Sequence, residues 1–242
     1  MFREAVYVAP VLALLLVVSC GTRTDPLAAF PRVVLWAWER PEHLLYIDPH
    51  TTGVAFLART ITWGGGELTW RPRYQPLDLA PGTVVMAVVR MEALPGPLPD
   101  AETVATRIAE VAQQPGVQAL QVDFDARQSE REWYTSVLQR VRQRLRPPVT
   151  LNITALASWC LGDPWIRNLP VNDAVPMLFR MGAGEPKQIT DFSAPVCRQS
   201  VGISTDEALL AVPHGRRLFI FHPRAWTPEA YRGAMGIAAR LR

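Results

Sequence analysis

Eight short apolar runs recur along the chain, and they constrain its fold more than any other feature of the sequence. Several are apolar at nearly every position, which is typical of strands buried on both faces of a parallel sheet. Eight such strands alternating with helices predict an α/β fold, a (β/α)8 barrel of the TIM type. The runs lie at residues 33–38, 54–58, 83–89, 117–124, 150–155, 174–179, 200–204 and 217–222.

The intervals between these runs predict an irregular outer ring. Residues 99–116, 129–148 and 227–242 carry apolar side chains at helical spacing, as Val104, Ile108 and Val111 do in the first of them. Residues 60–82 have no helical period and predict a β-hairpin around the glycines at 64–66, inserted after the second strand. The intervals after the sixth and seventh runs show no long helical pattern, so we expect some helices to be short or missing.

The first nineteen residues have the pattern of an export signal. A short start carrying Arg3 precedes an apolar stretch over 5–18. The last two valines of this stretch begin the sequence VVSC, which covers 17–20. That ending is similar to the lipobox of bacterial lipoproteins, so we predict a signal peptide over 1–19 and lipidation of Cys20. An ordinary secretory signal and an uncleaved anchor are the alternatives. We expect a tether over 20–31 and a single barrel domain over 32–242.

The residue after Cys20 bears on the localisation. It is Gly21, and not the aspartate that often retains such lipoproteins in the inner membrane. The sequence therefore predicts a lipid-anchored protein of the bacterial cell envelope, held in the outer membrane and facing the periplasm.

The two remaining cysteines, Cys160 and Cys197, stand 37 residues apart. In an exported protein such a pair most simply forms one disulfide. The alternative is a pair of metal thiolates, which needs further ligands, and the four histidines show no metal spacing. We therefore predict a disulfide and no metal site.

Composition and missing motifs exclude several classes of function. The 25 basic and 22 acidic residues leave a net charge of only +3, which is too small to predict a nucleic-acid partner. The chain has no G-x-S-x-G nucleophile motif. The glycine-rich stretch at 63–67 lacks P-loop spacing and is typical of a turn. We expect neither a cofactor nor a serine nucleophile.

Two aspartates, Asp123 and Asp125, end the fourth apolar run, LQVDFDA. Side chains alternate across a strand, so Leu120, Val122 and Phe124 share one face while the two aspartates share the other. The apolar face should meet the helices, which sends both carboxylates into the barrel near the carboxyl end of the strand. The fifth run repeats this pattern, with polar Asn152 on its inner face. Burying a carboxylate costs several kcal/mol unless the group forms an ion pair or stays hydrated, so these polar inner faces do not fit a plain core.

Other polar side chains follow the same ends of neighbouring strands, where barrel enzymes hold their active sites. One interpretation is a buried ion-pair network that plugs the barrel, for example Asp123 with Arg90 or Arg180. For the whole collection we favour a binding cleft. Its members are Glu39, Arg59, Arg90, Glu92, Arg180, Asp206, His222 and Arg224.

Tryptophans strengthen the prediction of a cleft. Trp36 and Trp38 share the inner face of the first strand, Trp159 follows the fifth, and Trp226 follows the eighth. An exposed indole face offers apolar area to the C–H groups of a sugar ring. The alternative is that most of these side chains simply fill the core.

The sequence resembles two families. LQVDFDA is similar to the Asp-rich end of the fourth barrel strand in chitinase-type glycoside hydrolases, but Arg127 stands where those enzymes have their catalytic glutamate. A wider set of segments is similar to a family of bacterial lipoproteins described as domain of unknown function 3142. This second resemblance implies a barrel distantly related to glycosidases, and it carries over no established activity. The segments are LWAWERPEHLLYIDPHTTGVAFLARTI, VDFDA, ITALASWCLGD, AVPMLFRMG, VGISTDE and HPRAWT.

Together these features predict a glycoside-hydrolase-like barrel that binds a polysaccharide or glycan and hydrolyses it. Hydrolysis of a glycosidic bond needs two carboxylates across the bond, and the candidates are Asp123, Asp125 and Glu92. The alternatives are a non-catalytic carbohydrate-binding or envelope-assembly protein and a purely structural or partner-docking protein. The predicted substrate-binding residues are Trp36, Trp38, Glu39, Arg90, Asn152, Trp159, Arg180, Asp206, His222 and Trp226.

Overall fold

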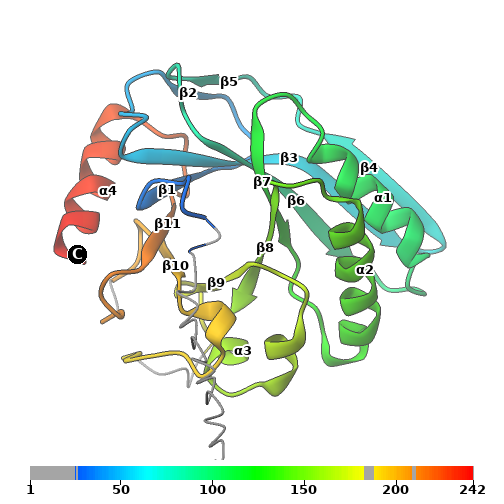
Figure 1. Ribbon diagram of the computed structural model, residues 1–242. Coiled ribbons are helices and arrows are strands. Elements are labelled where there is room, and N and C mark those ends of the chain that lie inside the picture. Colours follow the sequence, from blue (N-terminus) through cyan, green and yellow to red (C-terminus); the bar gives the residue numbers. More distant parts are fainter. Residues whose placement is uncertain (1–24, 26, 183–187, 209–210, 242) are drawn as a thin grey trace, which may run out of the picture.

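The computed structural model describes residues 25, 27–182, 188–208 and 211–241, and its centre is a closed barrel of eight parallel strands (Figure 1). The ring closes because β1 pairs in parallel with both β11 and β3. Each strand falls on one of the eight apolar runs, so the prediction of a TIM-like barrel is confirmed. The strands are β1 (Val33–Ala37), β3 (Thr52–Gly64), β6 (Val85–Ala93), β7 (Val117–Asp123), β8 (Thr150–Leu156), β9 (Asp173–Met177), β10 (Ser200–Ser204) and β11 (Arg217–Phe221).

The outer layer is incomplete, as the sequence predicts. Helix α1 (Ala101–Val111) follows β6, α2 (Arg131–Arg144) follows β7, and α4 (Pro228–Arg240) follows β11. Asp100 and Thr227 cap α1 and α4, because each side chain accepts a backbone N–H of the first turn. Only the short α3 (Ala157–Leu161) follows β8. The described residues between β9 and β10 and between β10 and β11 form no α-helix. No described helix has both the length and the apolar character that crossing a membrane requires.

A hairpin extends the barrel after its second strand. Strand β4 (Glu67–Pro72) pairs antiparallel with the end of β3, and Gly64 lies opposite Glu67 in the register. Gly65 and Gly66 form the turn with φ of 59° and 87°, a region that glycine enters without steric cost. The predicted hairpin is confirmed, and β3 is longer than its apolar run because the hairpin continues it. Two short strands, β2 (Glu42–Leu44) and β5 (Leu77–Leu79), pair separately.

Strand parity divides the core into two parts, as predicted. Leu120, Val122 and Phe124 pack in the outer core with residues of α1 and α2. The opposite faces of the strands fill the barrel interior, where Trp36 and Phe219 meet Met86, Val88 and Val175.

The segment expected to be a tether contributes to the fold. Leu27 and Phe30 are buried and pack with the interior residues Val34, Ala55 and Phe219. The guanidinium of Arg217 holds this segment, since it donates to the backbone carbonyls of Leu27 and Phe30. The described part of 20–31 therefore closes the amino-terminal end of the barrel, whereas the predicted signal peptide and Cys20 lie outside the described residues.

The predicted disulfide is confirmed. Cys160 in α3 is bonded to Cys197, and their Cα atoms are 5.8 Å apart. Cys197 belongs to a 3-10 turn, Pro195–Cys197, directly before β10. The bond therefore ties the segment after β8 to the segment before β10, in a part of the outer layer that lacks a long helix.

Candidate functional site

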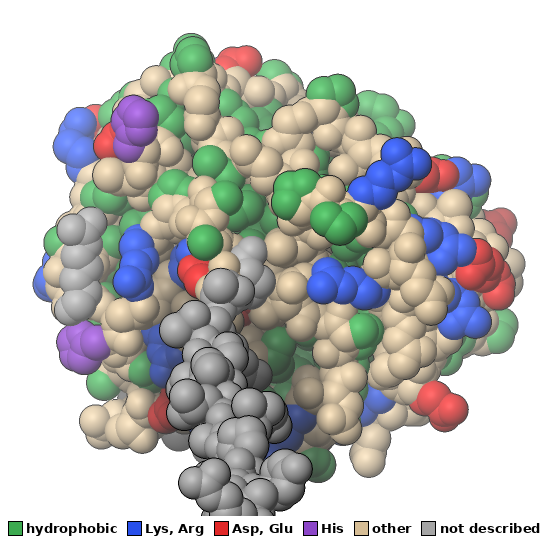
Figure 2. All heavy atoms as spheres, in the orientation of Figure 1, with side chains coloured by type: hydrophobic (Ala, Val, Ile, Leu, Met, Phe, Trp, Pro, Cys, Tyr) green, Lys and Arg blue, Asp and Glu red, His purple; other side chains and the backbone are tan. Residues whose placement is uncertain are grey.

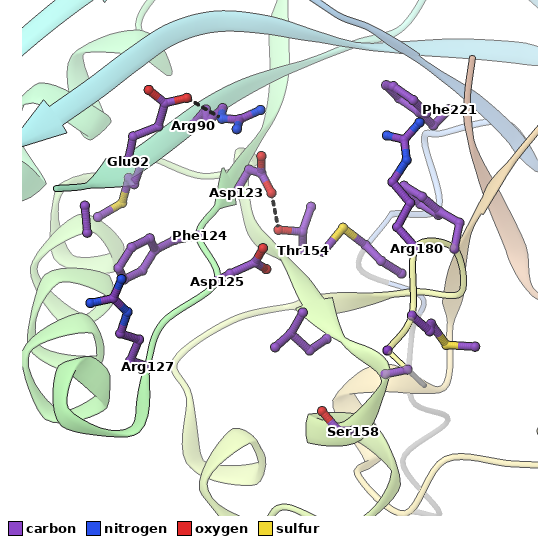
Figure 3. Close-up of a pocket in the computed structure, with 18 of the residues that line it drawn as sticks. Arg90, Glu92, Asp123, Phe124, Asp125, Arg127, Thr154, Ser158, Arg180 and Phe221 are labelled. Atoms are coloured by element: carbon purple, nitrogen blue, oxygen red, sulfur yellow. Dashed lines mark hydrogen bonds and ion pairs between the residues drawn. The ribbon is translucent and has the colours of Figure 1, made fainter. Parts of the chain in front are cut away.

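A pocket of about 740 Å³ opens at the carboxyl ends of the strands, where the sequence predicts the site (Figure 3). The ends of β1, β6, β7, β8, β9 and β11 all contribute to it. Seven of the predicted site residues line this pocket, which are Trp36, Trp38, Arg90, Glu92, Asp123, Asp125 and Arg180.

Asp123 is the last residue of β7, and it lies opposite Arg90 in the register of β6 and β7. Its Oδ1 accepts a hydrogen bond of 2.7 Å from the Thr154 hydroxyl on β8. Burial raises the pKa of Asp123, the negative charge of Asp125 adds to the rise, and the Thr154 hydrogen bond opposes it. This carboxyl group therefore holds a proton more strongly than an ordinary aspartate.

Asp125 follows two residues later, on the loop between β7 and α2, and points into the same pocket as Asp123 (Figure 3). Its side chain makes no hydrogen bond or ion pair with the residues that the structure describes. Partial burial raises its pKa as well, and the positive charge of Arg90 opposes the rise. The two aspartates are thus a pair of unneutralised carboxyl groups facing a cavity.

The nearby arginines pair with other acids. Arg90 forms an ion pair of 2.8 Å with Glu92, two residues along β6. Arg180 pairs with Asp206 at 3.5 Å. The alternative in which Asp123 pairs with Arg90 or Arg180 and plugs the barrel is therefore wrong, because both guanidinium groups bind carboxylates that lie closer to them.

Aromatic rings form the wall opposite the aspartates. Phe179 and Phe221 are stacked with their ring centroids 5.7 Å apart and their planes nearly parallel. The guanidinium of Arg180 lies 5.1 Å from the Phe221 ring, and that of Arg90 lies 5.6 Å from the Trp38 ring. Below them Trp36 forms part of the floor, where its indole N–H donates to Gln121 at 2.8 Å. The pocket thus combines apolar ring faces with charged groups.

Asn152 lies deeper in the barrel and does not line the pocket. Its side chain is fully buried, and its amide donates to the Leu120 carbonyl and the Thr150 hydroxyl. The Oδ1 atom has no partner among the described residues. Parity correctly placed Asn152 inside the barrel, but its position early in β8 leaves it beneath the floor.

Five other predicted binding residues lie outside the pocket lining. Trp159 packs against Trp165 in the outer core. Trp226 is buried, and its indole donates to the Trp36 carbonyl, so it supports β1 from outside. The remaining three bind neighbours at the rim: Glu39 pairs with Arg71, Asp206 with Arg180, and His222 with the Thr205 hydroxyl.

The alternation of side chains along β11 explains why His222 lies outside the pocket and why Phe221, which was not predicted as a site residue, lines it. Phe219 and Phe221 face the interior of β11, so His222 faces away. Phe179 and Phe221 lie in the sixth and eighth apolar runs, and the predicted site includes neither of them. Applying the alternation rule to the eighth run, as for the fourth, identifies Phe221 as a residue of the inner face.

The described residues contain no group of three or more histidine, cysteine, aspartate or glutamate side chains that could hold a metal ion. Comparisons with protein-family models, with curated proteins and with solved structures found no match to this chain.

Proposed function

We propose that this protein binds a glycan in the pocket at the carboxyl end of the barrel and hydrolyses a glycosidic bond there. The observation that carries the proposal is the pair Asp123 and Asp125, two carboxyl groups that face a 740 Å³ pocket without an ion pair although arginines line the same pocket. A structural role for Asp123 would favour its neutralisation, because it is half-buried and burial of an unpaired carboxylate is costly, whereas Asp125 is exposed to the pocket and open to a ligand.

Each group has a role that its surroundings favour. Asp125 reaches the open part of the pocket and carries a raised pKa, so it is suited to protonate the leaving oxygen. Asp123, held by the Thr154 hydroxyl, lies beside Asp125 and is its neighbouring acid, and the negative charge of Asp125 contributes to the raised pKa of Asp123. Glu92 on the neighbouring strand β6 is the second carboxylate that hydrolysis requires.

The aromatic wall suits a sugar. The Phe179 and Phe221 rings and the Trp38 ring offer apolar faces to sugar C–H groups, while Arg90 and Arg180 supply donors to hydroxyl oxygens. Glycan binding therefore draws on the same residues whether or not a bond is cleaved.

One observation favours a second function, glycan binding without hydrolysis. Arg127 lines the pocket at the position where the resemblance to chitinase-type enzymes implies a catalytic glutamate. In that case Asp123 and Asp125 only accept hydrogen bonds from sugar hydroxyls. Under both proposed functions, the protein is an envelope lipoprotein anchored through Cys20.

Replacing each aspartate by asparagine separates these functions. The full chain, purified from bacterial membranes, would be mixed with fragments of peptidoglycan and of exopolysaccharides. Binding would be measured by calorimetry and cleavage by release of reducing ends. We expect Asp125→Asn to retain binding and to lose about 100-fold or more in release, because general acid catalysis contributes about that much. Asp123→Asn should have the same effect to a smaller degree.

The matched control is Glu67→Gln, which removes a carboxylate at the exposed turn of the hairpin, and it should change neither quantity. Binding by the unmodified protein without any release supports the second function. If no glycan binds and no reducing ends appear, both functions are excluded.

A further inference from the structure

A second cavity lies at the opposite end of the barrel, where the strands begin. It has a volume of about 350 Å³ and is formed by the residues just before β1, β10 and β11. We call it the basic pocket, because four of its eight lining residues are arginines. The lining residues are Asp25, Arg32, Arg198, Gln199, His214, Gly215, Arg216 and Arg217.

Positive charge exceeds negative charge in the basic pocket. Arg217 pairs with Asp25 at 2.8 Å, and Arg216 pairs with Asp191, just outside the lining, at 2.9 Å. Arg198 shares Asp191 at 3.5 Å, so these three arginines have only two carboxylates between them.

Arg32 is the arginine of the basic pocket that forms no close ion pair with a described carboxylate, although its positive charge helps to lower the pKa of Asp25. It is exposed and donates to the Gly215 carbonyl. A buried donor, the Nε of Arg216, also lacks a hydrogen-bond partner among the described residues. Surplus guanidinium charge that converges on one cavity favours the binding of a phosphate group.

The chain as a whole carries a net charge of only +3. On the face shown in Figure 2, basic side chains are scattered among acidic and apolar ones and form no continuous block. The basic pocket is therefore a feature of one end of the barrel, and it does not reflect a generally basic surface.

The start of the described chain places this end near the predicted anchor. Asp25 is the first described residue, and it lines the basic pocket. Cys20, the predicted site of lipidation, precedes it by five residues, which span at most about 18 Å when fully extended. A chain anchored at Cys20 therefore holds the basic pocket close to the lipid headgroups.

We propose that the basic pocket binds the phosphate of an anionic phospholipid headgroup in the membrane that holds the anchor. This inference rests on the lipid anchoring included in the proposed function, but not on glycan binding. Binding there orients the barrel with its amino-terminal end on the bilayer and its glycan pocket directed away from the membrane.

Hydrogen exchange in nanodiscs tests this proposal. The full chain would be inserted into discs of pure phosphatidylcholine and into discs containing phosphatidylglycerol, so that the anchor is the same in both. Backbone exchange at 198–199 and 214–217 should slow at least about fivefold in the anionic discs, since each arginine near an anionic surface contributes about a factor of five in affinity. Half-molar salt should abolish the difference.

The variant Arg32→Gln/Arg198→Gln should lose this protection. The control Arg232→Gln/Arg240→Gln removes the same charge from the exposed face of α4 and should retain it. If the first variant fails to fold, the salt dependence of the unmodified chain still decides the outcome. Equal exchange in the two kinds of disc overturns the proposal.

Inorganic phosphate identifies the source of the bound group. Millimolar phosphate added to the phosphatidylcholine discs should leave exchange unchanged. If it protects the same segments as well as phosphatidylglycerol does, the pocket binds free phosphate and the assignment to a lipid is wrong. Intact mass of the same sample reports lipidation of Cys20, and reducing-end release reports the glycan function, so each failure is recognised separately.

Discussion

At the scale of single residues, the inner face of the barrel shows how burial and pairing set the state of an acid. Glu92 is ion-paired with Arg90, Asp123 is held by one hydroxyl, and Asp125 has no partner among the described residues. Parity predicts that Asp123 and Asp125 face inward, because it follows from the backbone alone. It does not predict that Arg90 turns to Glu92, because that choice depends on the side-chain directions of neighbouring strands.

Asp173, at the start of β9, is the extreme case. Its side chain is fully buried inside the barrel, and neither carboxylate oxygen has a hydrogen-bond partner in the described structure. Burial raises its pKa from 3.8 to about 7, and the nearby Ser200 hydroxyl and the positive charge of Arg217 offset only part of this rise.

This raised pKa predicts a stability that depends on pH. The folded chain binds a proton at Asp173 that the unfolded chain has lost, so the stabilisation is complete below about pH 4 and is lost as the pH rises to about 7. We expect the free energy of unfolding to fall across this range, by up to about 4 kcal/mol from this group. Asp173→Asn should flatten the fall in urea titrations between pH 4 and 8.

The exposed control Glu67→Gln should leave the pH dependence of unfolding unchanged. A wild-type free energy of unfolding that rises between pH 4 and 7, with the same rise in Asp173→Asn, would contradict this account of Asp173.

At the scale of elements, the sequence predicts each barrel strand and the three long helices, because apolar periodicity reports local burial. It also predicts the β3–β4 hairpin, because its glycines permit the turn. The outer layer around α3 is thin, and there the disulfide between Cys160 and Cys197 joins segments that no long helix covers.

We expect this disulfide to stabilise the fold. Closing a loop of 37 residues restricts the unfolded chain, and the chain-entropy model gives a contribution of about 4 kcal/mol. The variant Cys160→Ser/Cys197→Ser should lower the free energy of unfolding by about that amount in urea denaturation. Reductant should destabilise the unmodified protein equally and leave the variant unaffected, and a variant as stable as the unmodified protein would show that the bond is not needed.

At the scale of the whole molecule, the two ends of the barrel differ in how they are closed. The carboxyl end holds the large pocket, whereas Leu27 and Phe30 fill the amino-terminal end. This closure is not predictable from the sequence, because the segment is short, contains two prolines and follows a predicted signal peptide. Its burial is decided by the open mouth of the barrel, which forms only when all eight strands come together.

Truncation of this plug tests its contribution. We expect Leu27→Ala to lower the free energy of unfolding by about 3 kcal/mol, because a fully buried leucine is lost and a cavity remains. The control Leu45→Ala, at a side chain 64% exposed, should change stability by less than about 0.5 kcal/mol. Equal small effects in urea denaturation would show that residues 27–31 act only as a tether.

The sequence alone determined the number of barrel strands, the inward direction of Asp123 and Asp125 and the pairing of Cys160 with Cys197. Each depends on local alternation or on a count of residues. Only the tertiary structure decided that Trp159 and Trp226 belong to the outer layer, that Asn152 lies beneath the pocket, and that the segment before β1 closes the barrel. These depend on strand register and on the depth of each residue along its strand, which are fixed when distant segments pack together.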